Sequence, residues 1–415
     1  MTRSTSTQRA VVRIERPASG GGVAHLEDGC VVFVRDALPG ELVEVEIVQR
    51  TAKLARARAR DVLEAHGQRV EPPCPYARAG TCGGCDLQHA STDLQGAWKS
   101  QVASEQIRRI AGLPVDGAMT EPATPARGSR TRLRCAVDGD GRLALRGWRS
   151  HRLVPLESCW LLDERAGAAF DVRWSGAREV ELRAIGDEPP FAVVWPADGG
   201  APWTADVSGK RVEPSRVAHV GVGGIDFRVS ATSFWQAHVA APVMLSERVA
   251  RLSGVDAGDR VVDLFSGVGL FAAPLADLAG PDGRVIAVES SAGAVDDARH
   301  NLGARPQARV RLGAVDAARV TDTVREDDVV VVDPPRAGLG RRVAAALAYR
   351  RPRRVVYVSC DTATFARDLR EFLVAGFGLD SLEILDLFPM TEHVELVALL
   401  DRAGSTVDSA DEGRV

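Results

Sequence analysis

The sequence contains no long hydrophobic run and no overall excess of basic charge. None of its apolar segments reaches the roughly 18 residues that a membrane-spanning helix needs. The opening residues, MTRSTSTQRA, carry charge without the apolar segment of a secretory signal, so we expect a cytoplasmic protein without a membrane partner. The formal net charge of −4 does not indicate a globally basic nucleic-acid binder. What remains is a globular chain of 415 residues, a length that suggests two or three domains.

Basic residues are nevertheless concentrated in four runs in which Arg outnumbers Lys. The runs cover residues 50–60, 127–134, 146–152 and 349–354. Such runs are most often solvated faces, and a general bias toward Arg would produce the same excess. Phosphate recognition is the alternative, because the planar guanidinium matches phosphate oxygens better than an ammonium does.

The seven cysteines do not suggest a disulfide framework, because the number is odd and the expected compartment is reducing. Cys30 and Cys135 lie in strand-like runs, GCVVFV and RLRCAV, and are predicted to be core residues. The other five lie where a cysteine can do chemistry: three in one Pro/Gly-rich segment, one in LVPLESCWLL and one at the end of an apolar run.

The segment CPYARAGTCGGC brings Cys74, Cys82 and Cys85 close together in sequence, and we predict that they bind a metal or cluster. Zinc sites usually have two short cysteine pairs, whereas this segment has one, so the fourth ligand must come from elsewhere. Cys159 is the free candidate. Four unevenly spaced thiolates favour a 4Fe–4S cluster. A thioredoxin-like pair is weaker, since no βαβ pattern surrounds Cys82 and Cys85.

The pattern along the chain indicates three folded units and a tail. Short alternating strands broken by Gly and Pro predict a small closed barrel of about five strands at the N-terminus. A cysteine-rich connector, a helix over 93–113 and scattered strands follow, which we interpret as a mixed α+β central domain. The predicted units are residues 1–66, 67–230 and 231–402, with a disordered tail at 403–415.

The C-terminal unit repeats a strand-then-helix rhythm after a helix predicted over 235–252. Its strands are apolar without alternation, which is typical of strands buried on both faces of a parallel sheet. The sequence therefore predicts a doubly wound, Rossmann-like α/β domain. The expected strands are 260–265, 284–289, 308–313, 328–335 and 353–360, with a final pair near 383–400.

A nucleotide site is predicted at the turn after the first of these strands. Gly267 and Gly269 fit the pattern G-x-G-x-x-A, and Glu289 lies 20 residues after Gly269, where it can accept hydrogen bonds from ribose hydroxyls. This spacing is also that of a dinucleotide fingerprint. Asp263, four residues before Gly267, suits a cationic, amine-bearing ligand better than a pyrophosphate. We therefore favour S-adenosylmethionine over a nicotinamide, with Asp316 reaching the adenine amino group; no Gly-Lys-Ser/Thr follows, which excludes a P-loop.

Cys360 is the candidate nucleophile. It ends an apolar strand and directly precedes a polar helix start, DTATFARDL, where helix N–H groups favour the thiolate. Asp333, in Asp333-Pro334-Pro335-Arg336, ends another strand, and parallel strands bring their carboxyl ends to one crevice. A thiolate beside a methyl donor can attack carbon 6 of a pyrimidine, which makes carbon 5 nucleophilic enough to accept the methyl group.

The reaction then needs a base that removes the proton from carbon 5. The segment FPMTEHVE offers Glu392, His393 and Glu395. Glu395 is favoured because it carries an acid into the apolar strand ELVALL, where burial raises the pKa of the carboxyl. Gln236, in the segment SFWQ, can bond a base edge or the donor's carboxylate.

Taken together, these segments resemble the RNA uracil-carbon-5 methyltransferase family over nearly the whole chain. FWQ, DLFSGVG, VES, DPPRAGL, SC and FPMTEHVE follow the order of the family's catalytic motifs. The N-terminal barrel resembles a TRAM domain, an RNA-binding module with an OB-like fold, and CPYARAGTCGGCDLQHA with Cys159 resembles the family's 4Fe–4S site. The resemblance implies an enzyme that methylates structured RNA, with 23S ribosomal RNA favoured over transfer RNA. We also expect the protein to be a monomer.

The same resemblance implies a role for each matching position. Cys360 would be the nucleophile and Glu395 the base. The residues that would line the donor and uracil sites are Gln236, Asp263, Phe265, Gly267, Gly269, Glu289, Asp316 and Asp333. Two positions depart from the family: Asp361-Thr362 stands where Asn-Pro often follows the cysteine, and His238 stands where the family often has Asn two residues after the glutamine.

Two other readings of the sequence remain open. An iron–sulfur oxidoreductase would use a nicotinamide at the glycine turn and would not need Cys360. A non-catalytic RNA-binding protein would use only the barrel and the basic runs, and it would form no covalent adduct with RNA.

Overall fold

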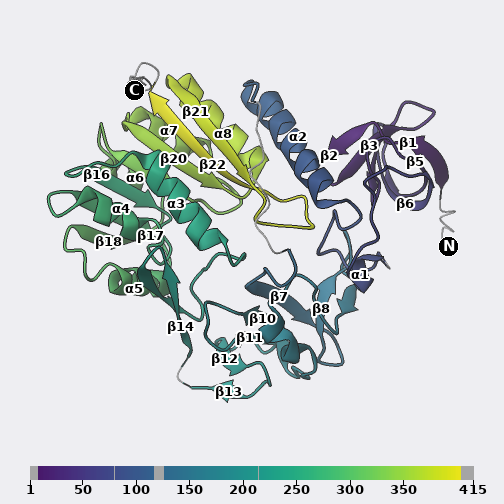
Figure 1. Ribbon diagram of the computed structural model, residues 1–415, viewed down its shortest axis with the longest axis horizontal. Coiled ribbons are helices and arrows are strands. Elements are labelled where there is room, and N and C mark those ends of the chain that lie inside the picture. The colour runs from purple at the N-terminus through teal and green to yellow at the C-terminus, as the bar shows by residue number, and fades with distance from the viewer. Residues whose placement is uncertain (1–7, 79, 116–125, 214, 403–415) are drawn as a thin grey trace, which may run out of the picture.

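The computed structural model describes residues 8–78, 80–115, 126–213 and 215–402, which form three units joined by a long helix (Figure 1). The predicted tail at 403–415 and the first residues of the predicted barrel lie outside this range. Within it, no helix is both long and apolar enough to cross a bilayer.

The N-terminal unit is one six-stranded sheet with the strand order β1-β5-β6-β4-β3-β2. Only Ile14 and Glu15 separate β1 from β2, although these strands stand at opposite ends of the order. Ile14 N–H donates to Glu41 while Glu15 N–H donates to Val23, so the two edges of the sheet meet there and the sheet closes as the predicted barrel. The strands are β1 (Arg9–Arg13), β2 (Arg16–Ala18), β3 (Gly21–His25), β4 (Val31–Arg35), β5 (Leu42–Arg50) and β6 (Leu54–Glu64).

The connector contains the short helix α1 (Pro75–Arg78) and leads into α2 (Thr92–Ala111). Ser91 caps α2 by accepting a hydrogen bond from the Leu94 N–H, and Gly112 ends it in the left-handed conformation. The predicted helix is therefore confirmed. Figure 1 shows α2 between the barrel and the C-terminal unit, and its Ala103 and Ile107 belong to the hydrophobic core of the latter.

The middle unit is an antiparallel sheet with the order β13-β12-β11-β10-β7-β8-β9. Cys135 is fully buried in its core, as predicted. A 3₁₀ helix over Glu164–Phe170 packs against this sheet. The strands are β7 (Arg132–Val137), β8 (Leu143–Arg146), β9 (Leu153–Pro155), β10 (Ala177–Arg183), β11 (Phe191–Pro196), β12 (Trp203–Asp206) and β13 (Arg211–Val212).

A hairpin of β14 (Val217–Val222) and β15 (Ile225–Ser230) leads into the C-terminal unit. It lies before the predicted boundary at residue 231, yet it is bonded to the C-terminal unit. Arg228 N–H donates to Asn301 at 2.8 Å, and Ser230 N–H donates to the buried Asp297 at 2.8 Å.

The C-terminal unit is a seven-stranded sheet with the order β18-β17-β16-β19-β20-β22-β21. The five strands from β18 to β20 are parallel, and β22 is antiparallel to both of its neighbours. Its Val-rich central strands are buried on both faces, as the absence of alternation predicts. The strands are β16 (Arg260–Leu264), β17 (Arg284–Glu289), β18 (Ala308–Leu312), β19 (Val329–Val332), β20 (Arg354–Ser359), β21 (Phe377–Leu385) and β22 (Glu395–Arg402).

Helices cover both faces of this sheet and bury a separate core on each. The first face carries α3 (Ala241–Ser253), α4 (Ala272–Ala279) and α5 (Ala292–Asn301). The second carries α6 (Ala317–Thr323), α7 (Arg341–Tyr349) and α8 (Thr362–Val374), together with α2. This arrangement confirms the doubly wound α/β domain and leaves the carboxyl ends of its strands free to form a site.

Candidate active site

The carboxyl ends of three neighbouring strands bring the predicted site residues to one edge of the sheet. Asp263 is the penultimate residue of β16, Asp333 follows β19 and Cys360 follows β20. β19 pairs with both β16 and β20, so these residues lie on adjacent strands. Ser359 is opposite Leu396 in the β20–β22 ladder, which places Cys360 beside Glu395 at the start of β22.

The turn after β16 has the backbone conformation that the glycine pattern predicts. Gly267 and Gly269 have φ of 54° and 91°, and Phe265 also has a left-handed φ of 65°. A left-handed Phe is strained and persists only where surrounding contacts hold it, which is common at ligand sites. The Gly267 N–H donates to Glu289 at 3.1 Å, so Glu289 closes the turn from the neighbouring strand.

Asp263 is fully buried and poorly satisfied in the protein alone. Neither of its carboxyl oxygens has a hydrogen-bond partner of regular geometry among the described residues, although the Ala272 N–H lies close enough to lower its pKa. Burial raises the pKa of Asp263 well above its usual range, and Asp333 and Glu289 raise it further. A buried acid without a donor is costly, and a bound cationic ligand would supply the missing charge and hydrogen bonds.

Asp316 has a structural task of its own in the free protein. It is the N-cap of α6, where its Oδ1 accepts a hydrogen bond from the Arg319 N–H at 2.7 Å. The side chain is exposed near the carboxyl end of β18. Contact with an adenine ring stays a prediction.

Cys360, Asp333 and Glu395 form one electrostatic group. Glu395 is 4% exposed, and burial raises the pKa of its carboxyl well above the usual range, with a further increase from Asp333. Burial also raises the pKa of Asp333 to about 7, while a hydrogen bond from Gln236 opposes the rise. Arg336 is the cation that faces both Cys360 and Glu395. At neutral pH this group therefore holds protons that can be exchanged during a reaction.

The prediction that the helix start favours the Cys360 thiolate is wrong for the free protein. Burial raises the pKa of the thiol to about 11, and Glu395 and Asp333 add to the rise. Asp361 does cap α8, since its Oδ1 accepts a hydrogen bond from the Thr364 N–H at 2.8 Å, but its charge also opposes thiolate formation. Desolvation and nearby acids thus outweigh the helix field, and a thiolate needs added positive charge.

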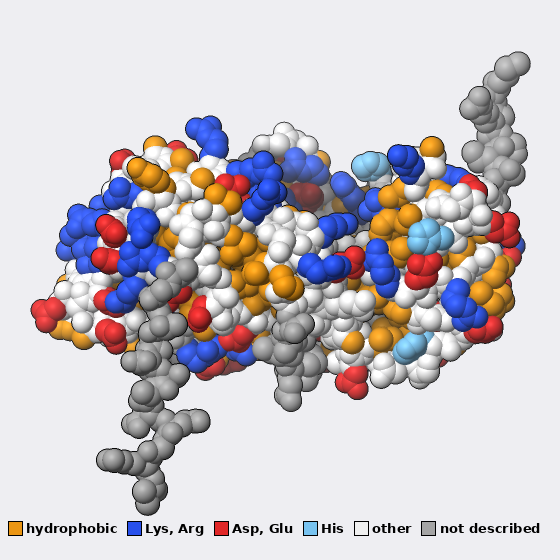
Figure 2. Space-filling view, turned by 90° about the horizontal axis from the view of Figure 1, so that it is seen from above, with side chains coloured by type: hydrophobic (Ala, Val, Ile, Leu, Met, Phe, Trp, Pro, Cys, Tyr) orange, Lys and Arg blue, Asp and Glu red, His pale blue; other side chains and the backbone are white. Residues whose placement is uncertain are grey.

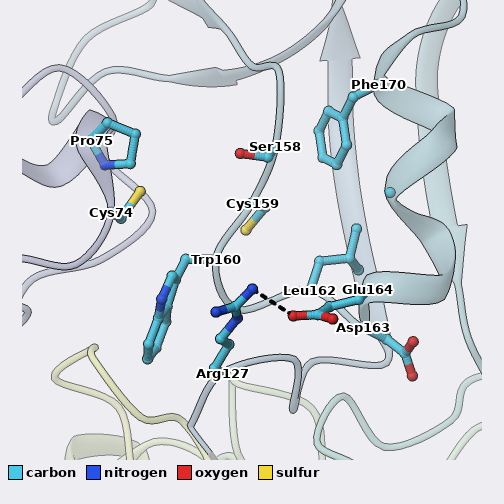
Figure 3. A pocket seen from close by; sticks show the side chains of 11 residues that line it. Cys74, Pro75, Arg127, Ser158, Cys159, Trp160, Leu162, Asp163, Glu164 and Phe170 are labelled. Atoms are coloured by element: carbon cyan, nitrogen blue, oxygen red, sulfur yellow. Dashed lines mark ion pairs between the residues drawn. The ribbon is translucent and has the colours of Figure 1, made fainter.

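The cysteine connector reaches the middle unit at the pocket drawn in Figure 3, where Cys74 and Cys159 approach each other from different segments. Burial raises the pKa of Cys82, and Cys159 and Cys74 raise it further; burial raises the pKa of Cys85 to about 12, with smaller increases from Cys159 and Cys82. The four thiols are therefore close enough to influence one another's charge. Among the described residues, however, no three His, Cys, Asp or Glu side chains are grouped tightly enough to hold one metal ion. The pocket has a volume of about 250 Å³.

Packing requires a glycine at Gly83 inside this segment. A Cβ at Gly83 would lie 2.8 Å from the backbone nitrogen of Trp148 and 2.9 Å from the carbonyl oxygen of Arg146. The Gly83 N–H instead donates to Arg146 at 3.0 Å, which ties the cysteine loop to the middle sheet. The Cys82 sulfur accepts a hydrogen bond from Gly84 at 3.3 Å.

Sequence reasoning missed two charged groups near the site. Arg336 belongs to the segment DPPR, and the available signal was a basic residue only three positions after Asp333. Lys99 gave no signal, because nothing in α2 marks it as buried. It is 1% exposed and donates to Asp386 at 2.6 Å, immediately after β21.

Comparison with known proteins agrees with this geometry. Residues 216–403 match the family model of tRNA (uracil-5-)-methyltransferases, and residues 3–59 match the TRAM domain. The chain is 32% identical to the 23S rRNA (uracil(1939)-C(5))-methyltransferase of Halomonas elongata, over 93% of this chain and 88% of that protein. The chain belongs to the RNA (uracil-5-)-methyltransferase family.

Two further relatives of this RNA (uracil-5-)-methyltransferase match over nearly their full length. An uncharacterized RNA methyltransferase of Streptomyces avermitilis is 38% identical over 93% of this chain and 97% of its own. The crystal structure of the Pyrococcus abyssi tRNA (uracil-54, C5)-methyltransferase in complex with S-adenosyl-L-homocysteine superposes with a TM-score of 0.67 and 25% identity. It covers 94% of this chain and all of the other.

Proposed function

We propose that this RNA (uracil-5-)-methyltransferase uses S-adenosylmethionine to methylate carbon 5 of a uridine through a covalent Cys360–uracil intermediate. The observation that supports this most strongly is the single group formed by Cys360, Glu395 and Asp333 at the strand ends. Asp263, Glu289 and the glycine turn would hold the donor, since a buried unsatisfied carboxyl fits its cationic amino group.

In the proposed reaction, Cys360 acts as the nucleophile and Glu395 as the base. The Cys360 sulfur adds to carbon 6 of the uracil, and the electron pair of the ring double bond moves so that carbon 5 attacks the methyl group of S-adenosylmethionine. The methyl–sulfur bond of the donor breaks as the new carbon–carbon bond forms, and S-adenosylhomocysteine is the leaving group. Glu395, in its ionised form, then removes the proton from carbon 5, the double bond re-forms and the thiolate leaves. Glu395 suits this task because its raised pKa makes it a stronger base than an exposed carboxylate.

Protons must leave Cys360 and Glu395 before these steps. In the free protein the thiol pKa is about 11, so the neutral thiol predominates. A sulfonium beside Asp263 and Asp333 adds positive charge, which favours both the carboxylates and the thiolate. Arg336 already acts in the same direction on Cys360 and Glu395. Donor binding and activation of the nucleophile are therefore coupled in this proposal.

Trapping with a fluorinated substrate tests the covalent scheme. RNA containing 5-fluorouridine should form a denaturation-resistant complex with the protein in the presence of S-adenosylmethionine, because fluorine cannot be removed as a proton. Cys360→Ala should bind the same RNA and form no complex. Methyl transfer by Cys360→Ala at the parent rate, or no complex with the parent, would rule out the scheme.

We favour ribosomal over transfer RNA as the substrate. The chain is more similar in sequence to the Halomonas 23S rRNA enzyme, at 32% identity, than to the Pyrococcus tRNA enzyme, at 25%. Lys and Arg side chains gather on the face seen in Figure 2, at the end of the C-terminal unit and in the middle, which suits a phosphate backbone. Methylation of 23S rRNA and tRNA transcripts by the same preparation distinguishes the two, and a preference for tRNA would reverse the assignment.

We also propose that Cys74, Cys82, Cys85 and Cys159 hold a 4Fe–4S cluster. The four thiols are close enough to raise one another's pKa, but among the described residues they are not grouped tightly enough to hold a single ion. A cluster of four irons holds its cysteine ligands farther apart than a single ion does. A cluster there would bond to three cysteines of the connector and one of the middle unit, and would so tie the two together. Protein purified or reconstituted without oxygen should contain about four irons per chain, with visible absorbance that Cys159→Ser reduces. Stoichiometric zinc in place of iron would contradict this assignment.

A further inference from the structure

The loop that delivers Glu395 is held by helix α2, the cysteine connector and the barrel. This base loop, residues 386–394, connects β21 to β22 and begins at the last pair of their ladder, Leu385 opposite Glu395. In Figure 1 it is the yellow segment that extends from the sheet toward the lower end of α2. Because Glu395 is the first residue after the loop, any shift of the loop moves the proposed base relative to Cys360.

Helix α2 makes the most buried of these contacts. Lys99 donates to Asp386 at 2.6 Å and to the carbonyl of Phe388 at 3.0 Å, at the start of the base loop. Gln95, 2% exposed, accepts a hydrogen bond from the Met390 N–H at 2.9 Å and donates to the carbonyl of Ala90 at 2.9 Å. These side chains hold the loop from one face of a rigid helix.

The cysteine connector holds the same loop from another side. The N–H groups of Asp86 and Leu87, directly after Cys85, both donate to the Met390 carbonyl at 3.0 Å. Met390 has a left-handed φ of 65°, which costs a non-glycine residue energy and persists only when neighbours impose it. Its N–H and its carbonyl are thus both fixed by groups outside the C-terminal unit.

The barrel supplies a third contact. Glu392 accepts hydrogen bonds from the Gly20 N–H and from the Ser19 hydroxyl in the turn between β2 and β3. Within the loop, the Thr391 hydroxyl donates to the Phe388 carbonyl at 2.8 Å and accepts from the His393 N–H at 3.3 Å. The nine residues of the base loop are therefore held by contacts at the start, in the middle and near the end of the loop.

We propose that Gln95 and Lys99 are positioning residues for the step in which Glu395 removes the carbon 5 proton. This inference rests on the proposed role of Glu395 as base. Neither side chain is needed for attack by Cys360 on carbon 6 or for methyl transfer to carbon 5, because their side-chain hydrogen bonds go to the base loop and to Ala90, just before α2. Their loss should therefore slow the last step alone.

A displaced base leaves a chemical signature that a general loss of stability does not. After methyl transfer, the methylated uracil remains bonded to the Cys360 sulfur until a base removes the carbon 5 proton. If Glu395 is out of reach, this adduct accumulates with ordinary uridine RNA. An unstable protein, in contrast, loses RNA binding and adduct formation together.

Gln95→Met tests the proposal because it keeps the side-chain length and removes the amide. The variant should still transfer one methyl group per enzyme rapidly, but release of product should slow by about 10- to 100-fold, as for a catalytic group displaced by about 1 Å. The methylated adduct should then appear on a denaturing gel with uridine RNA, at unchanged affinity for RNA and donor. Gln95→Glu keeps the acceptor for the Met390 N–H but loses the donor to the Ala90 carbonyl, so it should restore part of the release rate.

Controls separate this proposal from the proposed function. Glu395→Gln should accumulate the same adduct; if it does not, the base assignment fails whatever Gln95 does. If Glu395→Gln accumulates adduct while Gln95→Met releases product like the parent, the positioning role is refuted. Ile107→Val, a buried apolar change on the same helix, should turn over normally.

A second variant keeps the test valid if Gln95→Met does not fold. Asp386→Asn retains an oxygen that accepts from Lys99 and removes only the charge of the buried pair. It should accumulate adduct to a smaller extent than Gln95→Met. Release at the parent rate in folded Asp386→Asn would contradict the contribution of Lys99.

Discussion

Asp333 and Glu395 are two carboxyl groups buried in one site. Their raised pKa values serve the proposed catalysis, but they also make the ionised forms unfavourable for the folded protein. Burial and the nearby Asp333 raise the pKa of Glu395 well above its usual range, and burial raises the pKa of Asp333 to about 7. Both carboxyls thus bind protons more tightly in the folded than in the unfolded protein. The stability that this provides is complete below the unfolded pKa of about 4 and is lost as the pH rises through the folded values.

Replacement of Glu395 by Gln should therefore stabilise the protein selectively at higher pH. We expect Glu395→Gln to raise the free energy of unfolding by roughly 1–4 kcal/mol at about pH 8 and to have little effect near pH 4, while it abolishes product release. Thermal unfolding of parent and variant at both pH values measures the difference. An equal difference at the two pH values would show that packing, and not the proton, is responsible.

At the scale of elements, β6 and the turn after β8 bring two arginines together. Arg56 lies 5.6 Å from the Phe33 ring, and Arg149 lies 6.0 Å from the Trp148 ring. Burial lowers the pKa of Arg56, and Arg149 lowers it further, so the cations are close. Neither forms an ion pair with a carboxylate among the described residues, unlike many arginines of the basic runs. Two close cations flanked by aromatic rings suit a phosphate with its adjacent base.

Removal of this pair should weaken RNA binding through charge. For Arg56→Ala/Arg149→Ala, we expect the slope of log Kd against log salt to fall by about 1 to 2, because about two phosphate contacts are lost. Arg211→Ala removes an exposed arginine of the middle sheet that is paired with Glu213, and it serves as the control. RNA titrations at several salt concentrations supply the slopes. Equal slopes for the parent and the double variant would argue against a phosphate at this place.

The elements also show which parts of the fold a sequence can predict. The strands around Val262, Val331 and Val356 were predictable because an apolar run without alternation can only be buried on both sides. Asp333 and Cys360 were predictable as neighbours, since parallel strands end at one edge. The contact of Lys99 with Asp386 spans 287 positions, and no local pattern encodes such a pairing.

The raised thiol pKa was not predictable for a related reason. The helix field at Cys360 is a local property that the sequence indicates correctly, and Asp361 caps the helix. The opposing carboxylates come from two other strand ends, so their effect depends on how the whole sheet is assembled. The local sequence indicates only the effect of the helix N-terminus on Cys360, whereas the pKa of the thiol depends on several interacting charges from other segments.

At the scale of the whole molecule, the base loop makes the order of synthesis important. The barrel, the connector and α2 leave the ribosome first, and β22, which begins with Glu395, is among the last described segments of the chain. Because β22 lies between β20 and β21, the sheet and the loop are completed together. The barrel can therefore fold while the chain is still growing, whereas the catalytic centre is complete only when β22 has been made and has paired with β20.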